Sequence, residues 1–324
     1  MKRLLSLERK DFEKERDMLT SLTLKGHQHL VKLLVTYTYK NRFHLLCPFA
    51  NSNLREYWIS TPSIRNGPSY LWALEQIAGL ASGLNVIHNF GTSYPLGSDH
   101  ADPLVSATRP SLGFQMNVDP EEVMYGRHGD LKPENILWFN YFEGFGKAGV
   151  LQIADLGLGR FHRLESRSGL DPRTITGSPT YIPPELALDK FVSRAYDIWS
   201  FGCIFLEFIT WLLEGGVGLH NFGQARMAVA PDGVIDDLFY MLIDSGLGKR
   251  AEIRQGVTDW MERLRLHPFC SDMVLDLLDL VQNCMLKVNS EDRIRAYELE
   301  TFLTKKVEES KTKPSYLLGR TSGY

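Results

Sequence analysis

The chain has 324 residues, 44% of them hydrophobic and 23% charged, a composition close to that of soluble folded proteins and unlike that of disordered or fibrous chains. The formal net charge is only −3, which argues against a general nucleic-acid-binding surface. The four cysteines lie far apart without a CxxC pair, which excludes a dense disulfide framework and a cysteine zinc site and favours an intracellular location, cytoplasmic or nuclear.

The first 50 residues predict an amphipathic helix followed by a β-hairpin. Residues 11–24 place apolar side chains at positions 12, 18, 19 and 22 among charges, the spacing of a helix with one buried face. Residues 30–39 and 43–49 are rich in Leu, Val, Thr, Tyr and Phe, and the polar residues between them suit a turn. The apolar run at the N-terminus is too short for a signal peptide.

Helical patterns dominate from residue 53 onward. The longest predicted helix covers residues 71–88, and residues 89–125, rich in Gly, Pro, Ser and Asp, are expected to form an insertion. Short strands are predicted at residues 135–139 and 150–154, ahead of a loop at 155–185. Further helices are predicted at residues 194–213, 233–244, 256–265 and 272–286, and a frayed polar tail at 305–324.

The most apolar stretch covers residues 198–213. It is shorter than the about 20 residues that a membrane-spanning helix needs, and it contains the charged Glu207. We therefore expect a buried core helix there, and no membrane among the partners of this chain.

Residues 128–135 read HGDLKPEN and carry groups that suit phosphoryl transfer. This reaction requires a carboxylate that orients a hydroxyl and takes its proton, a cation near the transferred phosphate and an oxygen ligand for Mg²⁺. Asp130, Lys132 and Asn135 match these three roles. Alone, the stretch would be read as a polar turn between two strands. It resembles the catalytic loop of eukaryotic-type protein kinases, whose usual form is HRDLKxxN, and its HGD wording is similar to that of some fungal kinases.

A second motif begins at Asp155, twenty residues after Asn135. The sequence Asp-Leu-Gly resembles the metal-binding DFG motif of protein kinases, with Leu156 in place of the usual Phe. The resemblance implies that Asp155 and Asn135 hold Mg²⁺ against the phosphates of ATP, because magnesium takes few carboxylates and completes its coordination with phosphate and water.

Residues 177–185, GSPTYIPPE, resemble the GTPxYxAPE motif at the end of the kinase activation segment. The resemblance implies that Glu185 pairs with Arg293, and a buried Glu without a cation would cost several kcal/mol. Asp197 opens a stretch that resembles the family's DVWSxG motif, in which the Asp accepts backbone donors of the catalytic loop. The alternative for Asp197 is a simple helix N-cap.

The ATP-binding residues are assigned by the same resemblance. Lys2 lies where the family places the lysine that grips the ATP phosphates, and Glu15 matches the helix glutamate that pairs with it, although Glu8 and Glu13 are alternatives. The carbonyl of Pro48 and the N–H of Ala50 are expected to bind adenine at the hinge. A proline is tolerated at the first position because only its acceptor is used.

The resemblance predicts a two-lobed α+β fold with a small strand-rich N-terminal lobe and a large helical lobe. We expect a partial small lobe with the hinge at residues 1–50, a large lobe at 51–304 and the polar tail beyond it. No GxGxxG loop precedes residue 11, so we expect the chain to begin inside the third strand of the small lobe.

The implied activity is that of a Ser/Thr protein kinase, with ATP and Mg²⁺ as cofactors and a protein as substrate. The alternative is a pseudokinase or truncated fragment that acts as a binding module, to which the missing glycine-rich loop points. Retention of all four catalytic-loop and metal residues favours catalysis. Gly129 stands where many kinases have the Arg that neutralises a phosphate on the activation segment, so we expect phosphorylation there to change activity little.

Overall fold

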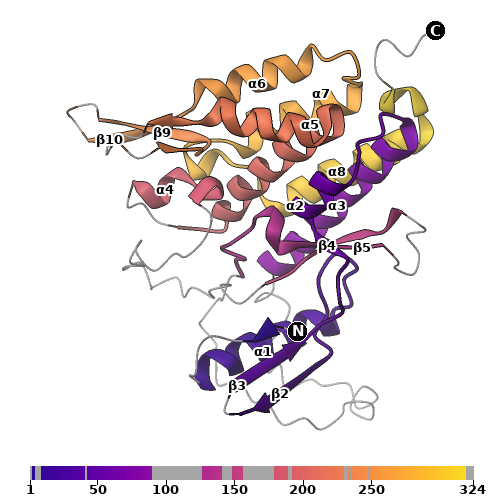
Figure 1. Ribbon diagram of the computed structural model, residues 1–324, viewed down its shortest axis with the longest axis vertical. Coiled ribbons are helices and arrows are strands. Elements are labelled where there is room, and N and C mark those ends of the chain that lie inside the picture. The colour runs from indigo at the N-terminus through magenta and orange to yellow at the C-terminus, as the bar shows by residue number, and fades with distance from the viewer. Residues whose placement is uncertain are drawn as a thin grey trace, which may run out of the picture.

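A computed structural model describes residues 2–3, 9–40, 42–89, 126–140, 148–155, 179–188, 192–229, 235–244 and 248–318, with Gly233 and Gly246. Figure 1 shows a small part that contains the N-terminus and a larger, mainly helical part. This arrangement is the two-lobed α+β fold expected for a protein kinase. Of the insertion predicted at residues 89–125, all residues after 89 lie outside the described part of the chain.

The small lobe is a three-stranded antiparallel sheet with one helix. Strands β1 (Lys2–Arg3), β3 (Arg42–Leu46) and β2 (Val35–Tyr39) lie in this order, and β2 and β3 form the predicted hairpin with Thr36 opposite Leu45. Helix α1 (Arg9–Leu24) lies beside the sheet in Figure 1, and its Phe12 ring stacks on Phe43 at 4.3 Å between centroids. One face of the sheet is thereby covered by the apolar side of α1.

Two capped helices follow the hinge. Strand β4 (Ser52–Asn53) leads into α2 (Leu54–Ser60), where the Asn53 side chain accepts from the Glu56 N–H and Glu56 accepts from the Asn53 N–H. This capping box satisfies two N–H groups that the first helical turn leaves unpaired. Helix α3 (Gly67–His88), capped by Asn66, contains the predicted helix at 71–88 and begins earlier.

The catalytic-loop region lies on a second small sheet. Strands β4, β5 (Ile136–Phe139) and β6 (Val150–Ile153) pair in this order, and the 3₁₀ turn η3 (Pro133–Asn135) precedes β5. Both strands predicted in this region are confirmed, to within a residue at each end. This sheet lies between the small lobe and the helices of the large lobe (Figure 1).

The large lobe is built around α5 (Ala195–Arg226), which is kinked at Gly215. By length and composition this helix could cross a membrane, but 72% of its most apolar window is buried in the protein. The prediction of a core helix at residues 198–213 is confirmed, since all of them are buried. The predicted helices near 256–265 and 272–286 are also confirmed, as α6 (Gln255–Arg265), α7 (Asp272–Leu280) and a π-helical turn at Val281–Met285.

The helix predicted at residues 233–244 is wrong. The described part of this region forms short strands, and β9 pairs antiparallel with β10 in register from Tyr240 opposite Ile253 to Asp244 opposite Lys249. The physical reason is that Gly246 and Gly248 have positive φ and turn the chain back. The strands are β7 (Ala228–Val229), β8 (Ile235–Asp236), β9 (Tyr240–Asp244) and β10 (Lys249–Ile253).

The frayed tail predicted from residue 305 is also wrong. Helix α8 (Ala296–Thr312) runs through the predicted boundary at 304, and the 3₁₀ turn η10 (Pro314–Leu317) follows it. Tyr316 and Leu317 are buried, and the Tyr316 hydroxyl donates to Asp276 on α7 over 2.7 Å. Helix α8 lies beside α3 (Figure 1), and Ser82 and Asn85 on α3 each donate to Glu300 over 2.6 Å. The segment is therefore part of the large lobe up to residue 318.

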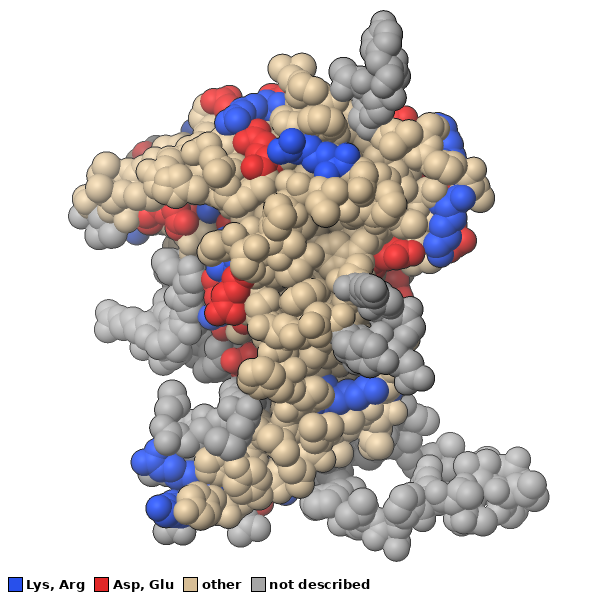
Figure 2. Space-filling model, turned by 45° about the vertical axis from the view of Figure 1, so that its right-hand side comes forward, with Lys and Arg blue, Asp and Glu red and all other residues tan. Residues whose placement is uncertain are grey.

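On the face in Figure 2, acidic and basic side chains are interspersed over the large lobe, and basic side chains predominate among the described residues of the small lobe at the bottom. This mixture agrees with the small net charge of −3.

Candidate active site

A buried aspartate holds the start of the catalytic loop. The N–H groups of His128 and Gly129 each donate to a different carboxylate oxygen of Asp197 over 2.8 Å, and His88 Nε2 lies 2.8 Å from Oδ2. Burial alone would raise the pKa of Asp197, but the hydrogen bond and charge of His88, with His128 and the Gly129 N–H, lower it below its usual value. The expectation that Asp197 accepts catalytic-loop donors is confirmed, and the N-cap alternative is not, since Arg194 is the cap of α5.

Gly129 is suited to its position by its backbone conformation. Its φ is 78°, in the region that residues with a Cβ rarely adopt. In this conformation the Gly129 N–H donates to Asp197. The side chain of the next residue, Asp130, is only partly buried. Glycine at this position therefore fits the turn that the loop takes before Asp130.

Asp130, Lys132 and Asn135 come together in this loop. Lys132 Nζ lies 2.8 Å from Asp130 Oδ2, and Asn135 Nδ2 donates to the same oxygen over 3.0 Å and to the Asp130 carbonyl over 2.8 Å. The Asp130 side chain keeps 18% of its surface exposed. The carboxylate is thus held in place by a cation and an amide while it remains accessible to a hydroxyl from outside.

Asp155 directly follows Ala154, which lies opposite Asn135 at the end of the β5–β6 pair. The Ala154 N–H donates to the Asn135 carbonyl over 2.8 Å, and His128 Nε2 lies 2.8 Å from the Ala154 carbonyl. Asp155 is exposed and has a φ of 60°, and such strain in a residue other than glycine often marks functional positions. The structure therefore brings two predicted magnesium ligands to one end of the β5–β6 pair; Leu156 and Gly157 lie outside the described residues.

The donor types fit magnesium better than a transition metal. Since Asn135 Nδ2 is engaged with Asp130, the amide oxygen is the atom that can face a cation. The described residues contain no group of three or more His, Cys, Asp or Glu that could hold a metal alone. Mg²⁺ does not need such a group, because it is usually bound by one or two carboxylates together with phosphates and waters.

The hinge lies at the end of β3, where the small lobe joins the large one. Cys47 and Ala50 pack against a small apolar cluster of Val31, Phe139, Val150 and Ala154 that is separate from the main core. Pro48 is half-buried, Phe49 is 93% exposed, and the Asn51 N–H donates to the Trp138 carbonyl over 3.0 Å. An apolar surface of this kind is suited to a flat aromatic ring.

The two predicted phosphate-binding residues lie on the small lobe. The backbone of Lys2 pairs with Leu45 in the sheet, and Glu15 lies in α1. The side chains of Lys2 and Glu15 are outside the described part of the chain, so the Lys2–Glu15 ion pair stays a prediction.

A histidine joins the two lobes, and sequence reasoning missed its role. The Val31 N–H donates to the Ile153 carbonyl over 3.0 Å, and the Ile153 N–H donates to the His29 carbonyl over 2.8 Å. The His29 ring is buried, with Nδ1 2.8 Å from the Leu151 carbonyl. Burial lowers the pKa of His29 to about 4, against which the hydrogen bond to Leu151 acts only in part. His29 is therefore neutral at pH 7 and acts as a structural donor.

The predicted pair of Glu185 and Arg293 is confirmed. Arg293 donates to the two Glu185 oxygens over 2.8 and 2.7 Å, in a bidentate arrangement. Both side chains are buried, at 0% and 2% exposure. The pair fixes the short segment at residues 179–188 to the large lobe.

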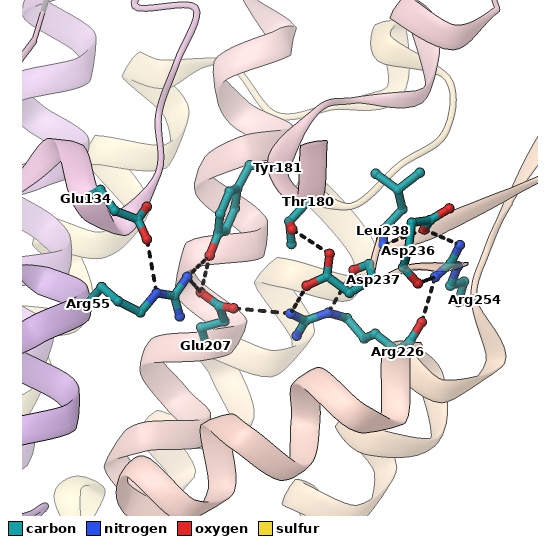
Figure 3. A network of polar contacts seen from close by, with 10 residues as sticks. All are labelled: Arg55, Glu134, Thr180, Tyr181, Glu207, Arg226, Asp236, Asp237, Leu238 and Arg254. Carbon is teal, nitrogen blue, oxygen red and sulfur yellow. Dashed lines mark hydrogen bonds and ion pairs between the residues drawn. The ribbon is translucent and has the colours of Figure 1, made fainter. Parts of the chain in front are cut away.

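A second ionic network, with a buried centre, was not predicted (Figure 3). Its centre is Glu207 on α5, which lies 3.3 Å from Arg55 on one side and 3.3 Å from Arg226 on the other. The Tyr181 hydroxyl also donates to Glu207 over 2.8 Å. The single signal in the sequence was a glutamate inside the most apolar run. Nothing in the sequence identified its partners, and one of them, Arg55, lies 152 residues earlier in the chain.

Comparisons with known proteins agree with this site. Residues 124–216 match a family model described as protein kinase domain. Among similar proteins, CBL-interacting serine/threonine-protein kinase 9 of Arabidopsis thaliana is 36% identical over 28% of this chain and 20% of its own length. Serine/threonine-protein kinase ksg1 of Schizosaccharomyces pombe is 33% identical over 28% of this chain and 17% of its own length. Probable cyclin-dependent kinase 8 of Dictyostelium discoideum is 42% identical over 26% of this chain and 21% of its own length. The chain thus matches about a fifth of the length of these relatives.

Proposed function

Because this chain contains part of a eukaryotic Ser/Thr-type protein kinase domain, we propose that it transfers the γ-phosphate of ATP to a serine or threonine hydroxyl of a protein. The observation that carries the proposal is the Asp130 carboxylate, held by Lys132 at 2.8 Å and Asn135 at 3.0 Å and still partly exposed. Phosphoryl transfer depends mainly on positioning and on charge, and this arrangement supplies both.

Asp130 is the proposed general base. It accepts the proton of the substrate hydroxyl and orients this hydroxyl toward the phosphate. Lys132 is the proposed cation that balances the charge developing on the transferred group. A scaffold has no chemical need for this pair beside Asn135, which argues against the alternative of a pseudokinase that acts only as a binding module.

Asn135 and Asp155 are the residues that would hold magnesium. When bound with ATP, Mg²⁺ neutralises the phosphate oxygens and helps to align the transferred group. The proximity of the Asn135 carbonyl to the Ala154 N–H, at 2.8 Å, supports a shared role for the two side chains. Asn135 also contributes by holding Asp130, so its substitution would disturb two functions.

Pro48 and Ala50 are the proposed adenine contacts, through the Pro48 carbonyl and the Ala50 N–H. The apolar cluster to which Ala50 and Cys47 belong would provide the surface for the ring. Lys2, paired with Glu15, would contact the phosphates. Together these assignments place the nucleotide between the two lobes, with the protein substrate on the side of Asp130.

The proposal is tested by radiometric phosphate transfer to a Ser/Thr-containing acceptor protein, together with nucleotide binding in the presence and absence of Mg²⁺. We expect Mg²⁺ to strengthen ATP binding to the wild-type chain, and we expect Asp155→Asn to remove that gain while metal-free binding stays within about twofold. The matched control is Asp244→Asn on the β9–β10 hairpin, which should keep the gain. An unchanged magnesium dependence in Asp155→Asn would exclude Asp155 from the site.

A further inference from the structure

Arg55 lies where three separate parts of the large lobe meet (Figure 3). Its Nε donates to Glu134 in the catalytic loop over 3.2 Å, and its second terminal nitrogen contacts the Tyr181 hydroxyl and lies 3.3 Å from Glu207 on α5. Burial alone would lower the pKa of Arg55, but the charges of Glu207 and Glu134 raise it above its usual value. One guanidinium therefore connects helix α2, the catalytic loop and the short segment at residues 179–181.

The contact with Glu134 reaches the candidate base through the loop itself. Glu134 is the middle residue of the 3₁₀ turn Pro133–Asn135, and the next residue, Asn135, donates to the carbonyl and the carboxylate of Asp130. A change in the orientation of this turn would move the Asn135 amide and, with it, the Asp130 carboxylate. Glu134, the partner of Arg55, is therefore the direct neighbour of Asn135, which holds the candidate base Asp130.

The contact with Tyr181 fixes the other side. Tyr181 is buried, its hydroxyl donates to Glu207 over 2.8 Å, and its carbonyl accepts from Ser200 Oγ over 2.9 Å. Burial and the charge of Glu207 raise the pKa of Tyr181 well above its usual value, so the hydroxyl stays protonated as a donor. The segment at 179–181 is thereby anchored to Glu207 on α5, the residue that also pairs with Arg55 and so connects to the catalytic loop.

The two arginines of the network differ in exposure, and this difference separates their roles. Arg226 is 3% exposed, lies over the Phe222 ring at 4.1 Å and contacts the Asp237 carbonyl over 3.2 Å, so it belongs to the core. Arg55 is 29% exposed and Glu134 41% exposed. The side of the network next to the catalytic loop is thus open to solvent, while Arg226 keeps Glu207 partly compensated when Arg55 is removed.

We propose that Arg55 is a positioning residue for phosphate transfer: it sets the orientation of the catalytic loop relative to the segment at residues 179–181. This inference rests on the proposed kinase function. Arg55 does not touch the reacting atoms; it acts through Glu134 and Tyr181. Its planar fork is needed because Arg55 donates to Glu134 and Tyr181 and also pairs with Glu207, and a lysine ammonium does not make these three contacts with the same geometry.

The test compares Arg55→Ala, Arg55→Lys and the control Arg263→Ala, an arginine that pairs with Glu214 over 3.0 Å on another helix. We expect kcat of Arg55→Ala to fall by about tenfold or more while the KM for ATP changes by less than about twofold, because misplacement of catalytic groups is costly in rate. The kcat of Arg55→Lys should lie between those of Arg55→Ala and the wild-type chain. Millimolar guanidinium should restore part of the kcat of Arg55→Ala and none in the control, because the ion can enter the vacated site.

A second measurement does not depend on activity, and it includes a milder variant in case Arg55→Ala folds poorly. Hydrogen exchange of the backbone amides at residues 128–135 and 179–181 should accelerate together in Arg55→Ala and in Glu134→Gln, a mild change at a 41% exposed side chain. If the wild-type chain transferred no phosphate, only the kinase proposal would be refuted, because hydrogen exchange would still report on the role of Arg55. A kcat within about twofold of wild type per folded molecule, or unchanged exchange at both segments, would overturn the role of Arg55.

Discussion

The buried pair of Arg293 and Glu185 provides a quantitative prediction. Arg293 donates to both Glu185 oxygens, to the Ala195 carbonyl over 2.9 Å and to the Lys287 carbonyl over 2.8 Å. In Arg293→Met the carboxylate of Glu185, 2% exposed, would lose its cation and both donors. Removing one partner of such a pair costs about 3–5 kcal/mol, because the remaining charge is buried without compensation.

This cost converts into a large thermal shift. For a domain of this size about 1 kcal/mol corresponds to roughly 2–4 °C in Tm, so we expect Arg293→Met to melt about 6–20 °C below wild type. The double variant Glu185→Leu with Arg293→Met should recover part of the loss, because it removes the isolated charge as well. The exposed pair of Arg263 with Glu214 gives the matched control, and Arg263→Ala should cost less than about 1 kcal/mol.

Urea unfolding followed by circular dichroism measures these differences as midpoints at constant slope. The reasoning would be refuted by a loss below about 1 kcal/mol in Arg293→Met, or by additive effects of the two substitutions. Either result would mean that Glu185 is solvated or paired with another cation in solution.

Three further predictions concern single positions. Burial lowers the pKa of His29 to about 4 from its usual 6.5, so the unfolded chain binds this proton between those values and the native chain does not. The free energy of unfolding should therefore rise with pH through this window by up to about 3 kcal/mol, and the whole gain should be present above it. His29→Asn keeps a donor for the Leu151 carbonyl, and in this variant the urea midpoint should depend less on pH. An unchanged dependence of the midpoint on pH would count against a buried neutral His29. Gly129→Ala should cost about 1–2 kcal/mol because φ is 78° there, and an equal urea midpoint would show that the loop adopts another conformation. Tyr316→Phe removes the hydrogen bond to Asp276 and should cost about 1 kcal/mol in thermal unfolding, whereas no change would support a loosely attached C-terminal segment.

Local motifs made the centre of the site predictable. The spacing within residues 128–135 placed Asp130, Lys132 and Asn135 together because all three lie in one turn before a strand. Asp155 was assigned through the resemblance of its motif to DFG, and the structure gives the physical basis: β5 and β6 pair antiparallel, so the chain after β6 returns to the start of β5. Asp197 and Arg293 could be assigned only through the resemblance to protein kinases, since their partners lie far along the chain.

The errors have a common physical cause, which is that long-range contacts decided the local structure. Residues 240–253 form a hairpin through cross-strand pairing around a turn with Gly246 and Gly248, although the apolar spacing before this turn also fits a helix. The C-terminal segment is polar in sequence, yet Tyr316 reaches a buried position against α7. Arg55 could not be assigned from the sequence because its partners come from three distant segments.

The central claim is that Asp130 acts as the base of a protein kinase, and single-turnover transfer from γ-labelled ATP by Asp130→Asn tests it most directly. The amide keeps the size of the side chain and its contacts with the loop but does not take a proton. We predict that transfer to a Ser/Thr acceptor protein falls by at least about a hundredfold, while Mg-ATP affinity and Tm stay close to those of the wild-type chain. Transfer at a rate near that of wild type, with the same nucleotide affinity, would contradict the assignment of Asp130 and the account of the site built on it.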